Sequence, residues 1–309
     1  MKKWIVAAGC LLLLFAASGQ SVRNSVVHAF QRVAGSANGG GSLDAQDITG
    51  ESAVLMDGKT GELLFAKKES QRMYPASTTK IVTALIALEK GKPDEEVTVG
   101  AEVHLKEAGE SKAGLKQGQT AALIDLVYAM MLPSGNDAAR AVAVHLSRRL
   151  SGNGKMSEDE CIRYFAKLMN DRAKKAGAKD TNFVNPHGLH DDRHVTTARD
   201  LALIAKEAMN NERFRTVVQS AAYPATVSTR GQGTVKLALA NTNKLLQKET
   251  PYFYAAASGI KTGFTDQAGY CLVSSAVKGN TEVIAVVLHS TAEDVWRDSR
   301  LLLENGGRK

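Results

Sequence analysis

The chain has 309 residues, which is enough for one large domain or two small ones. Hydrophobic residues make up 44% of it, so a sizeable core can form, and 39 basic against 32 acidic residues give a formal charge of +7. This modest positive excess suits peripheral contact with an anionic cell wall or membrane. No run of Lys and Arg with interleaved aromatic residues indicates a nucleic-acid-binding face, so nucleic acid is not an expected partner.

The N-terminus has the three-part pattern of a secretory signal peptide. Lys2 and Lys3 precede an almost entirely apolar run from Trp4 to Ala17, and small residues follow. That run is short for a membrane span. We therefore expect export to an extracytoplasmic location. The expected organisation is a signal peptide over 1–20, a flexible linker over 21–43 and a folded catalytic domain over 44–309.

Removal of the signal peptide would leave two cysteines, Cys161 and Cys271. Both lie in patterned segments, which is typical of buried thiols. A disulfide is also compatible with an exported protein, so both interpretations stay open.

The first predicted element of the domain is a hairpin. The runs 52–57 and 62–67 have the composition of strands, and the turn between them is bounded by Gly58 and Gly61.

A helix is predicted next, with Ser77 and Lys80 at its start. Residues three apart lie on one face of a helix. The run from Ile81 to Leu88 is apolar nearly all the way round, which indicates a buried helix. Burial takes water away from Lys80, so its pKa should fall, and a neutral amine beside a serine hydroxyl can take its proton. The pair is therefore a candidate activated nucleophile.

The middle of the chain is mainly helical, and the last third returns to strands. We expect helices over 124–131, 137–150, 158–176, 197–209 and 292–303. We expect a long loop over 181–195 and strands over 234–239, 256–262, 270–277 and 282–289. Strands at both ends with helices between them predict one mixed sheet with an inserted helical subdomain.

Three short motifs occur in one order along the chain. They are Ser77-x-x-Lys80, Ser134-Gly135-Asn136 and Lys261-Thr262-Gly263. This order is typical of penicillin-binding proteins and serine β-lactamases. Each motif has further matches elsewhere, but they lack this order and context. The first motif is matched by Ser275 and Lys278 in a strand-like run, the second in a glycine loop (151–153) and in the linker (36–38), and the third in a hairpin turn (59–61).

The likeness extends well beyond these motifs. It includes the segments YPASTTK, MLPSGNDAA, TNFVNPHGL, TTARDLALIA, NTNKLL and GIKTGFTDQAGYCLVSSA. From about Asp44 to Gly306 the chain resembles the low-molecular-weight penicillin-binding proteins, the serine D-alanyl-D-alanine carboxypeptidase family. The resemblance implies an α+β fold of the β-lactamase/DD-peptidase type, with a mainly antiparallel sheet flanked by helices and an inserted helical subdomain.

The resemblance also implies a reaction. The enzyme would remove the terminal D-alanine from peptidoglycan stem pentapeptides through an acyl-enzyme, and β-lactam antibiotics would acylate it. Ser77 would be the nucleophile and Lys80 its general base, and Ser134 would relay a proton towards the leaving amine. No metal and no cofactor is implied.

Further residues would bind the substrate by the same resemblance. Asn136 would hold Lys80 and bind the substrate amide, while Lys261 and Thr262 would bind the carboxylate. Gly263 would let the substrate backbone lie along the strand edge as an added strand. The backbone N–H groups of Ser77 and Phe264 would form the oxyanion hole.

Alternatives to the carboxypeptidase are also considered. A D,D-endopeptidase that cuts peptidoglycan cross-links would use the same residues. A class A β-lactamase would need a glutamate on the loop over 181–195, which has none. A non-catalytic penicillin-fold protein is disfavoured by the intact motifs.

Three other features bear on ligands and on domain organisation. The loop's histidines, His187, His190 and His194, have the residue type of a zinc site, but no second ligand cluster accompanies them. Thr242 stands where some relatives carry an arginine that holds the substrate carboxylate. That task would fall more to Lys261 and Thr262, or to Arg297 if the closing helix brings it near. Many relatives add a β-rich domain and an anchor, so this sequence is either a single-domain form or a truncated one.

Overall fold

The computed structural model describes residues 43–105 and 109–306. The expected signal peptide and nearly all of the expected linker lie outside the described residues. From Ala45 onward the chain clusters into one unit. In the described part of the chain, no helix is both long and apolar enough to cross a bilayer.

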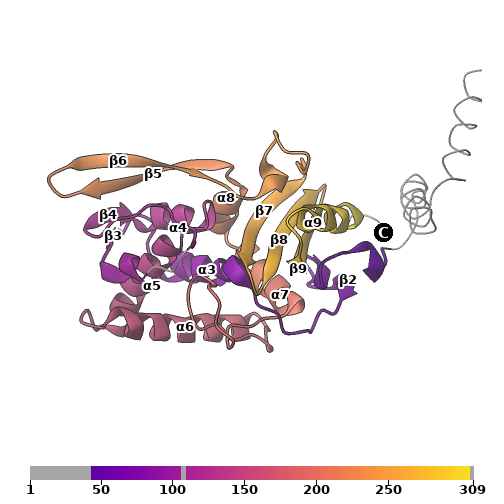
Figure 1. Ribbon diagram of the computed structural model, residues 1–309, viewed down its shortest axis with the longest axis horizontal. Coiled ribbons are helices and arrows are strands. Elements are labelled where there is room, and N and C mark those ends of the chain that lie inside the picture. The colour runs from indigo at the N-terminus through magenta and orange to yellow at the C-terminus, as the bar shows by residue number, and fades with distance from the viewer. Residues whose placement is uncertain (1–42, 106–108, 307–309) are drawn as a thin grey trace, which may run out of the picture. The chain divides into compact units, whose positions relative to one another are not determined.

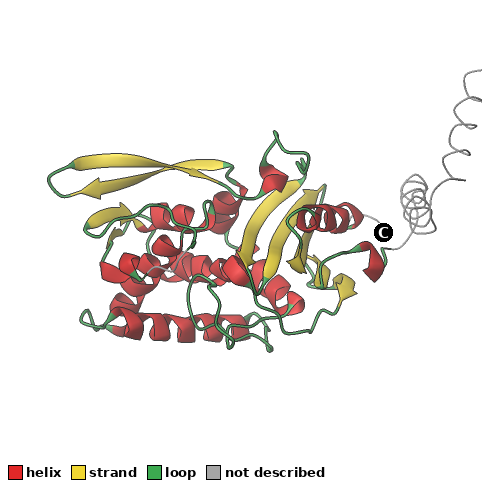
Figure 2. Ribbon diagram, viewed as in Figure 1, coloured by secondary structure: helices red, strands yellow, loops and turns green. Residues whose placement is uncertain are grey.

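The described residues form a sheet of five strands in the order β2-β1-β9-β8-β7, and every neighbouring pair is antiparallel (Figure 2). The strands are β1 (Ser52–Asp57), β2 (Leu63–Lys67), β7 (Ala257–Thr265), β8 (Gly269–Lys278) and β9 (Thr281–Ser290). The predicted hairpin is therefore confirmed, and the first strand of the domain pairs with the last. The mainly antiparallel sheet is also confirmed, whereas the expectation of one mixed sheet is wrong.

Helices cover both faces of this sheet. Residues 271–276 of β8 and 283–288 of β9 are buried without alternation, which requires cover on each side. Helix α9 (Asp294–Asn305) packs on β8 and β9, α7 (Ala198–Met209) on β1 and β9, and α8 (Glu212–Gln219) on β7.

The helical part of the molecule surrounds one buried helix, α3. Its members are α3 (Lys80–Lys90), α4 (Leu123–Met131), α5 (Asn136–Ser151) and α6 (Glu158–Lys175). Every residue of α3 from Lys80 to Leu88 is buried, and α4, α5, α6, α7 and α8 pack around it. The predicted buried helix is confirmed, and its N-terminal end points to the five-stranded sheet, where the short 3₁₀ helix η2 (Ala76–Thr79) packs on β7.

A second antiparallel sheet and α8 were not predicted. The sheet has the order β3-β4-β5-β6 among the described residues, with β3 (Glu96–Thr98), β4 (Gln119–Ala122), β5 (Ala222–Thr229) and β6 (Gly233–Ala240). Strands of three and four residues are too short to show a periodic pattern, and β4 meets β5 only after about a hundred intervening residues. The β5–β6 ribbon runs beside α4 (Figure 1).

Short 3₁₀ helices complete the described elements. They are η1 (Ala45–Asp47), η2 (Ala76–Thr79), η3 (Ala101–His104) and η4 (Lys244–Leu246). Of these, η2 precedes α3 directly and packs against β7.

Asp298 on α9 fastens the start of the domain to its last helix. Its buried Oδ2 accepts the backbone N–H groups of Thr49 and Gly50, each at 2.8 Å. Asp298→Ala would leave these donors without that acceptor, so we expect the free energy of unfolding to fall by at least about 2 kcal/mol in urea titrations.

Glu304→Ala on the same helix is the control. It removes an exposed pair with Arg300 and should change the free energy of unfolding by about 0.5 kcal/mol or less. Equal effects of the two substitutions would contradict the role given to Asp298.

Candidate active site

Ser77 lies on a 3₁₀ turn rather than in the α-helix itself. The turn η2 spans Ala76 to Thr79, and Lys80 is the first residue of α3. Ala76 has φ 48°, in the left-handed region that residues with a side chain rarely adopt. Ser77 remains partly accessible, while Lys80, three residues on, is fully buried. The pair therefore presents an accessible hydroxyl to an amine that is shielded from water.

Among the described residues, three oxygen atoms lie within hydrogen-bonding distance of Lys80 Nζ. Ser77 Oγ is 2.8 Å away, Asn136 Oδ1 is 2.6 Å away, and the carbonyl oxygen of His187 is 2.8 Å away. Burial, followed by the positive charges of Lys261 and Arg140, holds the pKa of Lys80 well below its ordinary value. The fall in pKa predicted from the sequence is confirmed.

The hydrogen-bonding capacity of a neutral amine matches these three oxygens. A neutral amine has two N–H donors and one lone pair. The oxygens of Asn136 and His187 can only accept, so they take both N–H groups. Of the three partners, only the Ser77 hydroxyl can donate, and the lone pair is left for it. This arrangement allows Lys80 to remove the proton of Ser77.

The second motif forms the turn between α4 and α5. Ser134 is buried and has φ 65°, and Asn136 is the first residue of α5. A Cβ on Gly135 would lie 2.7 Å from the carbonyl oxygen of Ala129, so only glycine fits this turn. The turn sets the Asn136 side chain against Lys80.

The third motif lies on β7, at the edge of the sheet as the structure describes it. Lys261 is buried, and its Nζ donates to the carbonyl oxygen of Thr262 at 3.0 Å. Burial lowers the pKa of Lys261 to about 7. The hydroxyls of Thr262 and Thr242 are 2.7 Å apart, and the Thr242 N–H donates to the carbonyl of Leu132, just before the second motif.

Gly263 also has a structural role that was not predicted from the sequence. A Cβ there would lie 3.0 Å from the Ser77 nitrogen and 3.1 Å from both Ala76 Cβ and the Pro75 carbonyl oxygen. The absent side chain therefore lets β7 approach the backbone of η2. Next along β7, the Phe264 side chain is half-exposed and contacts the Tyr270 ring at a centroid distance of 4.5 Å.

The loop over 181–195 packs its histidines around the Ser77 turn. His194 Nδ1 accepts the Val184 N–H, so its Nε2 carries the proton and donates to Thr79 Oγ1 at 2.8 Å. Burial lowers the pKa of His194 to about 3, and burial also holds the pKa of His187 well below its usual value. Within the described ranges, no three His, Cys, Asp or Glu side chains are grouped to hold a metal ion.

Sequence reasoning missed a buried ion pair behind Asn136. Glu110 and Arg140 are 2.6 Å apart, with side chains 0% and 2% exposed, and Glu110 Oε2 also accepts from Asn136 Nδ2 at 3.1 Å. Glu110 lies in a polar stretch without periodicity, so nothing marked it. The available signal was the position of Arg140 one helical turn after Asn136, which places both side chains on the same face of the helix.

Arg297 and the two cysteines in the described ranges do not contribute side-chain contacts to Lys80. The Arg297 guanidinium is bound by Asp294, Asp298 and Thr49, so its suggested approach to the site is wrong. Cys161 and Cys271 are both free and buried, which confirms the buried-thiol interpretation.

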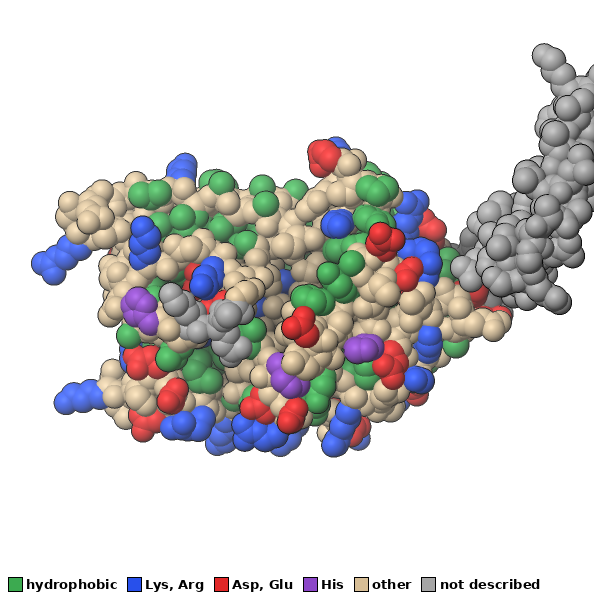
Figure 3. Space-filling model, viewed as in Figure 1, with side chains coloured by type: hydrophobic (Ala, Val, Ile, Leu, Met, Phe, Trp, Pro, Cys, Tyr) green, Lys and Arg blue, Asp and Glu red, His purple; other side chains and the backbone are tan. Residues whose placement is uncertain are grey.

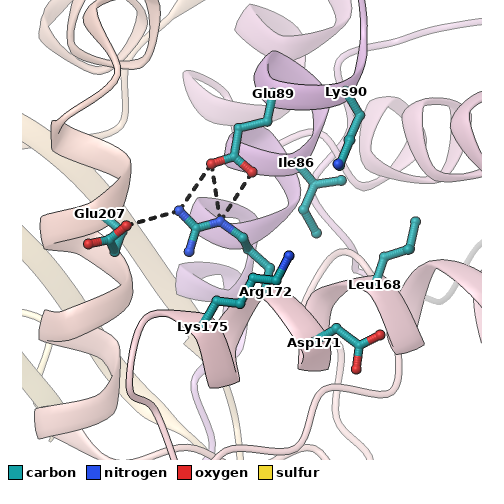
Figure 4. Close-up of a pocket in the computed structure, with 8 residues that line it drawn as sticks. All are labelled: Ile86, Glu89, Lys90, Leu168, Asp171, Arg172, Lys175 and Glu207. Carbon is teal, nitrogen blue, oxygen red and sulfur yellow. Dashed lines mark hydrogen bonds and ion pairs between the residues drawn. The ribbon is translucent and has the colours of Figure 1, made fainter.

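A separate pocket of about 440 Å³ lies at the C-terminal end of α3 and is lined by none of the predicted site residues (Figure 4). There Arg172 of α6 binds Glu89 of α3 and Glu207 of α7. On the face viewed in Figure 3, the surface is hollowed between the helices and the five-stranded sheet.

Known proteins are similar to this chain in sequence and in fold. A family model described as D-alanyl-D-alanine carboxypeptidase matches residues 40–292. The D-alanyl-D-alanine carboxypeptidase DacF of Bacillus subtilis is 37% identical over 240 residues, which is 77% of this chain and 56% of that protein. The chain therefore spans little more than half the length of this relative.

Two solved structures have the same fold. The Streptomyces K15 DD-transpeptidase gives a TM-score of 0.77 at 32% identity and covers 85% of this chain and 98% of its own. Penicillin-binding protein D2 of Listeria monocytogenes, in its ampicillin-bound form, gives a TM-score of 0.67 at 28% identity. The match covers 84% of this chain and 98% of that protein's chain. The predicted β-lactamase/DD-peptidase type of fold is confirmed.

Lys261 should titrate near pH 7 in the folded protein, against 10.5 for an ordinary lysine. Between these values the unfolded chain binds more protons at this group, so its contribution to the free energy of unfolding rises with pH. Side-chain ¹³C NMR, assigned with Lys261→Met, measures this pKa. The same variant should raise the pKa of Lys80, because a positive neighbour is removed. Titration of Lys261 near 10.5 would contradict its burial.

Gly263→Ala should destabilise the protein by about 1–3 kcal/mol, because the added Cβ crowds the Ser77 backbone. Gly154→Ala is the matched control, since a Cβ there meets no atom within 4 Å in the described structure. Urea unfolding of both variants tests this, and equal stabilities would show that β7 has room beside Ser77.

Proposed function

The chain belongs to the D-alanyl-D-alanine carboxypeptidase family, and from this we propose that it is a serine-type D-Ala-D-Ala carboxypeptidase. Its substrate would be the peptidoglycan stem pentapeptide, from which it removes the terminal D-alanine. The observation that carries the proposal is the buried Lys80 amine, whose Nζ lies 2.8 Å from Ser77 Oγ and within 2.8 Å of two oxygens that can only accept hydrogen bonds.

Acylation starts with the transfer of the Ser77 proton to the Lys80 lone pair. Ser77 Oγ then bonds to the carbonyl carbon between the two D-alanines, and the carbonyl oxygen becomes an oxyanion. The backbone N–H groups of Ser77 and Phe264 are the proposed donors to that oxyanion. Their placement at the contact of η2 with β7 supports this role.

Collapse of the tetrahedral intermediate breaks the carbon–nitrogen bond. The departing amine receives the proton held by Lys80, by way of the Ser134 hydroxyl. Water then attacks the ester carbon of the acyl-enzyme and gives its proton to Lys80; the bond to Ser77 Oγ breaks, and Ser77 takes that proton back. The stem peptide leaves one D-alanine shorter.

The substrate's terminal carboxylate is proposed to bind at Lys261, Thr262 and Thr242. The two hydroxyls, 2.7 Å apart, offer neutral donors, and Lys261 offers the charge. Burial holds the pKa of Lys261 to about 7, and an arriving carboxylate favours its protonated form. The Asn136 amide would bind the substrate backbone, which lies along the edge of β7.

The same site is proposed to react with β-lactams, whose ring amide Ser77 would open. The solved ampicillin-bound form of the Listeria relative supports this. Because peptidoglycan lies outside the cytoplasmic membrane, we place the protein in the extracytoplasmic space. This location agrees with the signal-peptide pattern of residues 1–20.

Mass spectrometry of muropeptides tests the proposal. Purified pentapeptide monomers and cross-linked dimers are incubated with the protein, with Ser77→Ala and penicillin-treated protein as controls. We expect monomers to lose one alanine while dimers stay intact, and both controls to be inactive because neither has a free Ser77 hydroxyl.

Other outcomes identify other functions. Splitting of dimers would indicate a D,D-endopeptidase, and new dimers would indicate transfer to an amine rather than to water. If wild type and Ser77→Ala gave identical mixtures, the protein would not act on these substrates.

A further inference from the structure

The orientation of the Asn136 amide decides whether Lys80 can act as a base. Its oxygen lies 2.6 Å from Lys80 Nζ. The two ends of an asparagine amide have nearly the same shape, so a half-turn would bring the NH₂ group to the same place. That group would donate to the Lys80 lone pair and withdraw it from Ser77. Some other group must therefore hold the amide in the productive orientation.

Glu110 has the chemistry to do so. Its Oε2 accepts from Asn136 Nδ2 at 3.1 Å, on the side of the amide away from Lys80. An ionised carboxylate can only accept hydrogen bonds, so it pairs with the NH₂ end of an amide and repels the oxygen end. We propose that Glu110, held by Arg140, is a positioning residue that keeps the Asn136 amide oxygen facing Lys80. This inference rests on the proposed function of Lys80 as the base.

Arg140 fixes the carboxylate itself. Its two terminal nitrogens donate to Oε2 of Glu110 at 3.0 Å and to Oε1 at 2.6 Å, a forked contact that sets the carboxylate plane. Arg140 follows Asn136 by four residues on α5, so both side chains project from one face of the helix. Both members of the ion pair are buried, which excludes water as a competing partner.

The segment that carries Glu110 is fastened to the same helix. The Asn136 N–H donates to the carbonyl of Ser111. The Asp137 carboxylate accepts the N–H groups of Ala113, Gly114 and Leu115 at 2.9–3.0 Å. Backbone and side-chain contacts thus place Glu110 against Asn136 independently of any substrate.

The test measures acylation by a fluorescent penicillin across pH, together with the melting temperature. Glu110→Gln keeps the shape of the side chain but replaces a carboxylate oxygen with an NH₂ group. Because glutamine can both donate and accept, it no longer holds the Asn136 amide in a single orientation. We expect the plateau acylation rate constant to fall at least about tenfold, as for the loss of one charge-assisted hydrogen bond. A structural role alone would lower the melting temperature without this loss of rate.

The pH profile gives a second readout. Acylation needs neutral Lys80, so its rate rises with pH through the pKa of that group. Burial and the charges of Lys261 and Arg140 lower this pKa, and those of Glu110 and Asp137 raise it; burial also holds the pKa of the neighbouring His187 well below its usual value. Removing the Glu110 charge should therefore move the acidic limb to lower pH, even as the plateau falls.

Two further variants separate positioning from stability. Glu110→Gln with Arg140→Met removes the unpaired buried charge. It should recover the melting temperature, return the acidic limb towards its original position and still acylate slowly. Glu89→Gln breaks the Arg172 pair at the far end of α3 and should acylate like wild type (Figure 4).

The proposal is overturned if either Glu110 variant is folded and acylates within about twofold of wild type, well short of the change that loss of a charge-assisted hydrogen bond produces. A wild type that folds but takes up no penicillin would instead refute the proposed function. The two failures are therefore distinguishable.

Discussion

A buried lysine amine whose pKa is held well below its ordinary value is the constraint on which the rest of the site depends. Burial alone would lower the pKa of Lys80, and the positive charges of Lys261 and Arg140 lower it further. A neutral amine in a dry site still needs partners for its two N–H groups. The oxygens of Asn136 and His187 supply them and leave the lone pair to Ser77. The environment that would make Lys80 a base, as proposed, therefore also orients its lone pair towards Ser77.

This environment is assembled from four segments that are distant in sequence, and close backbone approach brings them together. A Cβ on Gly188 would lie 1.8 Å from the carbonyl oxygen of Ala76, and one on Gly263 would crowd the Ser77 nitrogen. The left-handed φ angles of Ala76 and Ser134 store strain in the two turns that carry the motif serines. Rigid packing around α3 holds these turns in place, which is the usual condition for strained backbone at a reactive site.

Hydrogen bonds of Thr242 also connect the two sides of the site, the edge of β7 and the turn of the second motif. Thr242 bonds to Thr262 on β7 through its side chain and to Leu132 at the end of α4 through its backbone. The sheet edge and the turn of the second motif therefore keep a fixed separation. Glu110, Arg140 and Asp137 brace the same turn from behind. An ordering of this kind lets the reacting groups meet a substrate with little reorganisation, which favours catalysis.

The sequence by itself determined the motif residues, the hairpin, the buried character of α3 and the direction of the Lys80 pKa shift. These follow from local spacing and from hydrophobic periodicity, which a chain displays without its fold. Only the tertiary structure decided the antiparallel pairing of β1 with β9, the second sheet, the contact of Gly263 with the Ser77 backbone and the ion pair of Glu110 with Arg140. The pairing of β1 with β9, the pairing of β4 with β5 and the contact of Gly263 with Ser77 join residues a hundred or more positions apart, and Glu110 and Arg140 are thirty apart. Contacts of that range leave no periodic trace, because periodicity within a segment shows which of its faces is buried and not which distant segment covers that face.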